Sequence, residues 1–162
     1  MAFNKRVNGV SFGLIGTTDS LMNGLQFGSI YTFSTKINGI SITPFLLASE
    51  INGLQIVGVA AFVDTTNGVL ISLFGTTPFD MIGSKIINGL AIGGVVINSE
   101  KVNGVVISGI LCAADELNGV SFSCFNLTKS LHGFQFGLIN YAANNRKLFR
   151  VMPFMNFNLK KK

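Results

Sequence analysis

The stretch Asn88-Gly89-Leu90-Ala91-Ile92 returns 15 residues later as Asn103-Gly104-Val105-Val106-Ile107, and after 15 more as Asn118-Gly119-Val120-Ser121-Phe122. On either side of these three copies, corners of the same type recur to give nine in all, and the numbers of successive corner Gly residues differ by 15, 15, 14, 15, 21, 15, 15 and 14. A short, nearly fixed period indicates a repeat architecture built from stacked units. The nine corners are Asn8-Gly9, Asn23-Gly24, Asn38-Gly39, Asn52-Gly53, Asn67-Gly68, Asn88-Gly89, Asn103-Gly104, Asn118-Gly119 and His132-Gly133.

The columns of residues around each corner Gly indicate the type of repeat. Positions one, three and six after the Gly are apolar in all nine repeats, and so are nearly all positions two before it. Steps of two are typical of a β-strand with one buried face, whereas a helix requires steps of three and four. We therefore expect an all-β fold, a triangular parallel β-solenoid of about 15 residues per coil, with these apolar columns facing inward.

This solenoid is expected to comprise about nine to ten coils over residues 1–141. Residues 142–162 leave the repeat and are expected to form a C-terminal cap and basic tail, because the end of a repeat stack exposes unpaired backbone and core. No comparable segment precedes the first coil, so the N-terminal end is expected to be open to end-to-end association.

The same alternation along the strands predicts which residues face outward. The column two after the Gly, which includes Val106, should form a mostly polar outer face, so that Ile107→Asp should disrupt the stack and Val106→Asp should be tolerated. The column seven after the Gly should place an apolar strip on the surface, which a partner is expected to cover. The predicted interface residues of this strip are Tyr31, Leu46, Val96 and Leu111.

The corners differ in chemistry. Gly at the first corner accepts a positive φ, and the stacked Asn side chains before it should form a hydrogen-bonded ladder. The third corner carries most of the charge, and we expect the shortened and lengthened coils to differ there, the longest coil around Thr77-Pro78-Phe79-Asp80-Met81. The predicted ladder comprises Asn8, Asn23, Asn38, Asn52, Asn67, Asn88, Asn103 and Asn118.

The charge distribution argues against a nucleic-acid partner. The net charge of +5 resides mainly at the two ends of the chain, and no repeated basic stripe runs along a face. Cys112 and Cys124 lie in columns three residues apart, about 10 Å along a strand, so both are expected to be free thiols.

No residue pattern points to catalysis, and we expect neither enzymatic activity nor a cofactor or metal. His132 takes an Asn position and is expected to replace a ladder member, with no Ser or Cys close to it. The third-corner carboxylates alternate with Lys residues, which favours a solvated, charge-balanced turn over a glycosidase-like pair. These carboxylates are Glu50, Asp64, Glu100, Asp115 and Glu116.

Two coils carry the fullest form of the repeat, Asn23-Gly24-Leu25-Gln26-Phe27-Gly28 and His132-Gly133-Phe134-Gln135-Phe136-Gly137-Leu138-Ile139-Asn140. Over residues 7–141 the chain resembles bacterial surface-repeat proteins with Gly-Leu-Gln-Ile-Gly-Leu-Ile-Asn repeats, and Pro153-Phe154-Met155-Asn156-Phe157 is similar to their closing segments. The resemblance implies a bacterial envelope or surface setting. The first six residues lack the apolar core of a signal peptide, so the chain is either not exported by that route or a mature form.

Three functions are compatible with these patterns. The favoured one is a non-catalytic structural or binding module that self-associates through an apolar face or an open end, as a homo-oligomer or with another protein, or that contacts an envelope lipid or polysaccharide surface. An outer-membrane β-barrel is the alternative, although the phase break at the corners opposes it. Ice binding is a lesser alternative, because no column of Thr-x-Thr runs along a face.

Overall fold

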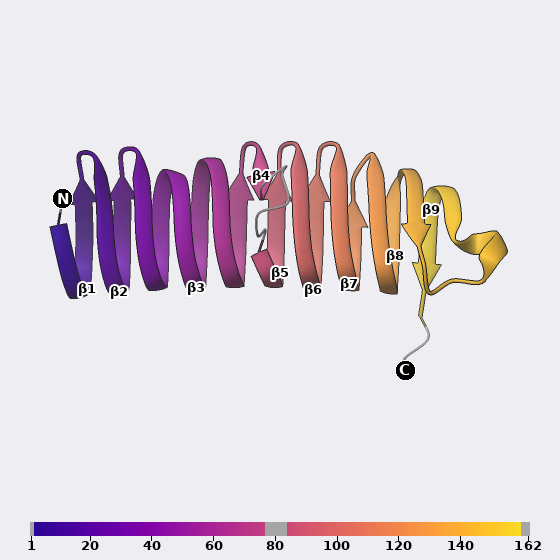
Figure 1. Ribbon diagram of the computed structural model, residues 1–162, viewed down its shortest axis with the longest axis horizontal. Helices are drawn as coiled ribbons and strands as arrows, with labels where there is room; N and C mark the ends of the chain where they lie inside the picture. The colour runs from indigo at the N-terminus through magenta and orange to yellow at the C-terminus, as the bar shows by residue number, and fades with distance from the viewer. Residues whose placement is uncertain (1, 77–83, 160–162) are drawn as a thin grey trace.

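The protein is a rod of stacked β coils (Figure 1). A computed structural model describes residues 2–76 and 84–159, with side chains described over 6–74 and 85–159. Almost every described residue lies in a strand. The elements are β1 Ala2–Gly13, β2 Gly16–Gly28, β3 Tyr31–Ser72, β4 Gly75–Thr76, β5 Ser84–Gly93, β6 Val96–Ser108, β7 Leu111–Phe122, β8 Phe125–Ala142, the 3-10 turn η1 Lys147–Phe149 and β9 Val151–Asn158.

Successive coils pair in parallel with equivalent repeat positions in register. Asn8 pairs with Asn23 and then Asn38, and each corner Gly pairs with the Gly of the next coil. The chain makes eight turns between Gly9 and Gly133, and the 42-residue strand β3 runs through several coils without a break. The predicted fold class, a parallel β-solenoid of about 15 residues per coil, is confirmed.

The prediction of which residue columns face the interior is wrong for most columns. The column two after the corner Gly is buried throughout, with Val106, Gln26 and Ser41 each 0% exposed, whereas the columns one, three and six after it face outward. The columns two before the Gly and eight after it are inward as expected, for example Met22 and Ile37 in the first and Ile97 and Cys112 in the second. The chain therefore takes four residues, not three, to pass from one inward position to the next across the Asn-Gly corner.

The cause of this phase lies in the corner backbone and in the width of the coil. Every corner Gly has a φ between 118° and 145°, which turns the chain while the residues before and after it both stay outside. The coil interior is narrow, and the inward column four after the Gly holds small side chains or none, as at Gly28, Ser72 and Ser108. Phe12 and Phe122 could not fit there and lie outside, 67% and 44% exposed.

The interior contains both apolar and polar side chains. Two apolar clusters lie along the interior, one in the N-terminal half of the rod around Ile37 and Ile51 and the other in the C-terminal half around Val102 and Leu117. In the N-terminal coils, buried Gln26 donates from Nε2 to Thr17 Oγ1 and to Asp19 Oδ2, both at 2.9 Å. These polar groups bond one another across the coil, whereas both amide atoms of buried Gln55 and the hydroxyl groups of Ser41 and Ser121 have no hydrogen-bond partner among the described residues.

The two short coils lose their residue at the second corner, not at the third corner as predicted. Ile107 pairs with Phe122, 15 positions later in the sequence, but Leu111 pairs with Phe125, only 14 positions later. The missing residue therefore lies between Phe122 and Phe125. The other short coil behaves likewise, because Leu46 takes the buried place that Thr32 holds one coil earlier, whereas a coil of the usual length would put Leu47 there. The insertion predicted around Thr77-Pro78-Phe79-Asp80-Met81 lies outside the described residues.

The C-terminal end of the rod is closed by β9. This strand runs antiparallel to β8, with Phe134 opposite Phe157 and Tyr141 opposite Val151 (Figure 1). Asn145 links the segment by donating to Asn156 Oδ1 and accepting from Asn158 Nδ2, both at 2.8 Å. At the other end, β1 begins at Ala2 and pairs only with β2 among the described strands.

Candidate functional site

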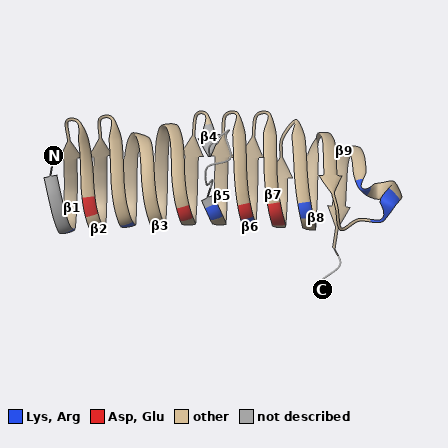
Figure 2. Ribbon diagram, viewed as in Figure 1, with Lys and Arg blue, Asp and Glu red and all other residues tan. Residues whose placement is uncertain are grey.

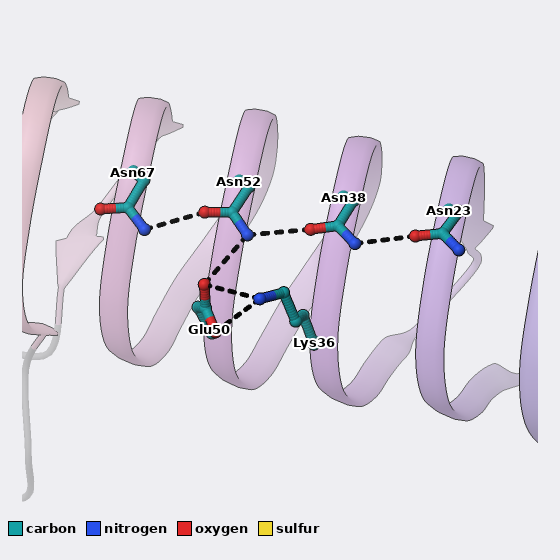
Figure 3. A network of polar contacts seen from close by, with 6 residues as sticks. All are labelled: Asn23, Lys36, Asn38, Glu50, Asn52 and Asn67. Atoms are coloured by element: carbon teal, nitrogen blue, oxygen red, sulfur yellow. Dashed lines mark hydrogen bonds and ion pairs between the residues drawn. The ribbon is translucent and has the colours of Figure 1, made fainter.

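The asparagine side chains form one continuous ladder along the rod. Each Asn donates from Nδ2 to the Oδ1 of the Asn one coil before it, over 2.7–2.9 Å, in an unbroken series from Asn23→Asn8 to Asn118→Asn103. Figure 3 shows four of these residues. All the ladder amides point the same way, so the ladder ties each coil to the preceding one.

Two glutamates join the ladder to the charged corner. Glu50 accepts from Asn52 Nδ2 at 3.0 Å and from Lys36 Nζ at 2.9 Å (Figure 3). Glu116 accepts from Asn118 Nδ2 at 2.9 Å and pairs with Lys101 at 3.2 Å. The same arrangement therefore occurs twice along the rod.

Among the described residues, four ion pairs, each between adjacent coils, account for most of the charge on the coils. Besides the two glutamate pairs, Lys85 lies 2.9 Å from Asp64 and Lys129 lies 2.8 Å from Asp115. The charged residues of the coils lie along one edge of the rod (Figure 2). The expectation of a charge-balanced turn agrees with these contacts, and no group of three or more His, Cys, Asp or Glu side chains in the described part could hold a metal ion.

The ion pairs shift three pKa values. Hydrogen bonds from Lys36 and then Asn52 lower the pKa of Glu50 below its ordinary 4.5, and those from Asn118 and then Lys101 lower the pKa of Glu116. Asp64 raises the pKa of Lys85 above 10.5. The charged forms are thus favoured in the folded protein.

These shifts predict the pH dependence of stability. A carboxylate with a lowered folded pKa stabilises the fold above its unfolded pKa, near 4.5, and this contribution is lost as the pH falls through the lower folded value. The raised pKa of Lys85 acts in the opposite sense. Its contribution to stability is present below pH 10.5 and is lost as the pH rises above that value. In urea unfolding between pH 7 and pH 3, the double variant Glu50→Gln/Glu116→Gln should lose less stability on acidification than the wild type. Glu100→Gln, outside the four ion pairs, is the control, and an equal effect from it would contradict the assignment.

His132 takes a ladder position, since it pairs with Asn118 of the previous coil. The expectation that no Ser lies near it is wrong, because Ser130 Oγ is 3.2 Å from His132 Nε2. The two residues are separated by one position on the same strand, and β-strand alternation brings such side chains to one face. This contact is local to the strand, and Glu116 of the preceding coil pairs with Ser130 beside it.

The predicted interface residues do not form one exposed strip. Leu46 is 0% exposed and belongs to the core, because the missing corner residue shifts it into an inward position. Tyr31, Val96 and Leu111 face outward and are half-buried. The prediction is therefore wrong for Leu46. The larger apolar surfaces are formed by the columns one, three and six after the Gly, which were predicted to face inward.

The main apolar surface is the face formed by the columns one and three after each corner Gly, here called the Gly-face. None of its eighteen side chains, two from each of nine coils, is buried. Its aromatic end is continuous with the cap, because Phe122 stacks on Phe136 with ring centroids 5.0 Å apart and Phe134 lies 6.2 Å from Phe157. The Gly-face comprises Val10, Phe12, Leu25, Phe27, Ile40, Ile42, Leu54, Ile56, Val69, Ile71, Leu90, Ile92, Val105, Ile107, Val120, Phe122, Phe134 and Phe136.

A second apolar surface runs along the second corner of the coils, here called the apolar ridge. It lies on the edge formed by the loops that join β1 to β2 and β6 to β7, opposite the charged edge (Figures 1 and 2). Its exposed large side chains are Leu14, Ile15, Ile30, Phe45, Leu73, Phe74, Ile110, Phe125, Leu138 and Ile139.

Two further features carry no recognisable chemistry. Cys112 and Cys124 are free, as predicted, and burial raises the pKa of Cys112 to about 12, which keeps this thiol unreactive. The cap also borders an open cavity of about 610 Å³, whose exposed lining is largely apolar and includes Phe149, Met152 and Met155.

No protein-family model matches the chain, and comparisons with characterised proteins and with solved structures found no match. Within the described residues, no helix has the length and apolar character needed to cross a membrane.

Proposed function

We propose that the protein is a non-catalytic structural or binding module, a rigid β-solenoid that self-associates through its Gly-face. The observation that supports this most strongly is the unbroken run of eighteen outward apolar side chains on one face. A protein surface of this kind is expected to be covered by a partner. The resemblance of the repeats to bacterial surface-repeat proteins favours a setting at a bacterial envelope or cell surface.

A second copy is the partner that best fits the shape of this face. The Gly-face is built from parallel strands and is roughly 40 Å by 13 Å, from about 4.8 Å per coil and 3.3 Å per residue. Two such faces can pack about 10 Å apart as in a β-sandwich, and a two-fold axis makes the same patch serve both copies. The area is on the order of the smaller specific interfaces.

The test is light scattering on a sizing column over a range of concentrations in detergent-free buffer. The wild type should be a defined oligomer, and Ile107→Lys should dissociate it, because Ile107 is 40% exposed on the Gly-face and a lysine there would be desolvated. The expected loss is about 2 kcal/mol, or roughly 30-fold in affinity. Ser20→Lys, on an exposed residue at the charged corner, is the matched control.

A monomeric wild type at all concentrations would contradict the proposal. So would an oligomer that Ile107→Lys leaves intact. Circular dichroism of each variant would verify that the coils stay folded.

A further inference from the structure

The apolar ridge differs from the Gly-face in shape, because it is a convex edge and not a flat sheet. Its side chains project from tight turns, and Leu14, Leu73 and Ile110 are 80%, 69% and 51% exposed. A convex row of this kind cannot stack on a flat partner as two sheets do. The hydrocarbon of a lipid layer, in contrast, adapts to the shape of an inserted edge.

Six of the ten ridge residues donate their backbone N–H groups to carbonyl groups of the adjacent coil, namely Ile30, Phe45, Leu73, Ile110, Phe125 and Ile139. Ile30 donates to Ile15 O at 3.0 Å and Phe45 to Ile30 O at 3.1 Å. The same series continues in the later coils, where Ile110 donates to Val95 O at 2.9 Å and Phe125 to Ile110 O at 2.8 Å. These donors need no water.

Inward polar side chains also donate to carbonyl groups at and beside the ridge. Ser108 Oγ lies 2.8 Å from Val95 O and 2.9 Å from Leu111 O, and Thr43 Oγ1 donates to Phe45 O at 3.0 Å. Asn126 Nδ2 donates to Phe136 O at 3.0 Å. Backbone in contact with hydrocarbon must be satisfied internally. The ridge donors named above meet this condition, and so do the carbonyl groups of Ile15, Ile30 and Ile110, which accept from the next coil.

The charges lie where they would stay in water. The ion pairs follow the edge opposite the ridge (Figure 2), roughly 15 Å away across a side of about five residues. Amphipathic elements at a membrane surface insert about 5–10 Å into the boundary between headgroups and acyl chains. At that depth the ridge would be buried and the ion pairs would not.

We propose that the ridge inserts into the surface of a lipid layer, so that the rod lies along the membrane with its charged edge and asparagine ladder in water. This contact goes beyond the self-association through the Gly-face and does not depend on it. The exposed basic residues Arg146, Lys147 and Arg150, beside Leu148 at 87% exposure, provide an additional contact for anionic headgroups at the cap.

The absence of tryptophan from the chain allows a direct test with single reporters. Ile110→Trp places the indole on the ridge, and Ser20→Trp places it at the charged corner. With phosphatidylcholine vesicles, the emission of Ile110→Trp should shift to shorter wavelength and be quenched by brominated acyl chains, and that of Ser20→Trp should do neither. The double variant Ile110→Glu/Phe125→Glu should bind vesicles roughly tenfold more weakly in flotation.

Several outcomes would overturn the inference. Ile110→Trp emission that does not respond to vesicles would exclude lipid insertion, and equal quenching of both reporters would exclude the orientation. A concentration-dependent blue shift of Ile110→Trp without lipid would identify a second copy as the occupant of the ridge. Ile107→Lys should still bind vesicles, and its failure to do so would assign lipid contact to the Gly-face.

Discussion

Val106→Asp is expected to unfold the coils around it, whereas Ile107→Asp, one residue along the strand, should leave the fold intact. Val106 is 0% exposed and belongs to the core cluster that contains Ala91 and Leu117. A carboxylate there has no cationic partner among the described neighbours in that apolar cluster, and an unpaired buried charge costs about 3–5 kcal/mol or more. This is a large part of the roughly 5–15 kcal/mol that typically separates folded from unfolded states.

Ile107 points to the opposite side and is 40% exposed, so a carboxylate at this position stays in water. The measurement is urea unfolding of both variants, followed by circular dichroism at low protein concentration so that association does not contribute. Val106→Ala is the control for lost volume. Greater damage from Ile107→Asp than from Val106→Asp would reverse the observed inward and outward phase.

The period and chemistry of the corners were sufficient to predict much of this structure. Spacing alone fixed the coil length and the parallel stacking, and it predicted the register in which Asn23 meets Asn38. The balanced charges were also visible in the sequence, as the Lys36–Glu50 pair illustrates. These features depend on position in the repeat and not on which face is buried.

The inward phase could not be obtained from apolarity, because apolar side chains lie on both sides of the strand. Val106 is inside and Ile107 outside, and hydrophobicity does not separate them. Aromatic side chains are the exception: no Phe is among the buried residues of the described part, and Phe27 and Phe122 face outward. The inward column four after the Gly is small, as at Gly28 and Ser108. In a narrow coil, the space inside limits volume more strictly than polarity.

The presence of apolar side chains on both sides of the strand also explains why the sequence does not reveal the candidate surfaces. A sequence rule that places apolar residues inside removes the Gly-face from consideration, and with it the ridge. The position of Leu46 depended on a local event, the loss of one residue at the second corner, which changes the face of every residue up to the next corner. Sequence spacing records that a residue is missing but not at which corner.

Gly104→Ala is expected to destabilise the rod far more than Gly9→Ala, although both positions have a positive φ, of 141° and 118°. At Gly104 a Cβ atom would meet the carbonyl oxygen of Gly89 in the adjacent coil, whereas at Gly9 it would meet no atom within 4 Å. Gly9→Ala should therefore cost only the backbone strain, about 1–3 kcal/mol. Gly104→Ala adds a backbone clash that the parallel stack can relieve only by separating two coils.

The pair of variants separates two reasons for glycine at the corners. If conformation alone requires it, both substitutions should lower the free energy of unfolding equally in urea titrations. If close stacking of coils requires it as well, Gly104→Ala should lose about 2 kcal/mol more, within the usual range for overpacking. Because the carbonyl of each corner Gly lies against the Gly of the next coil, from Gly24 through Gly133, the second result is expected at every internal corner. Glycine would then maintain the coil spacing on which the asparagine ladder and both apolar surfaces depend.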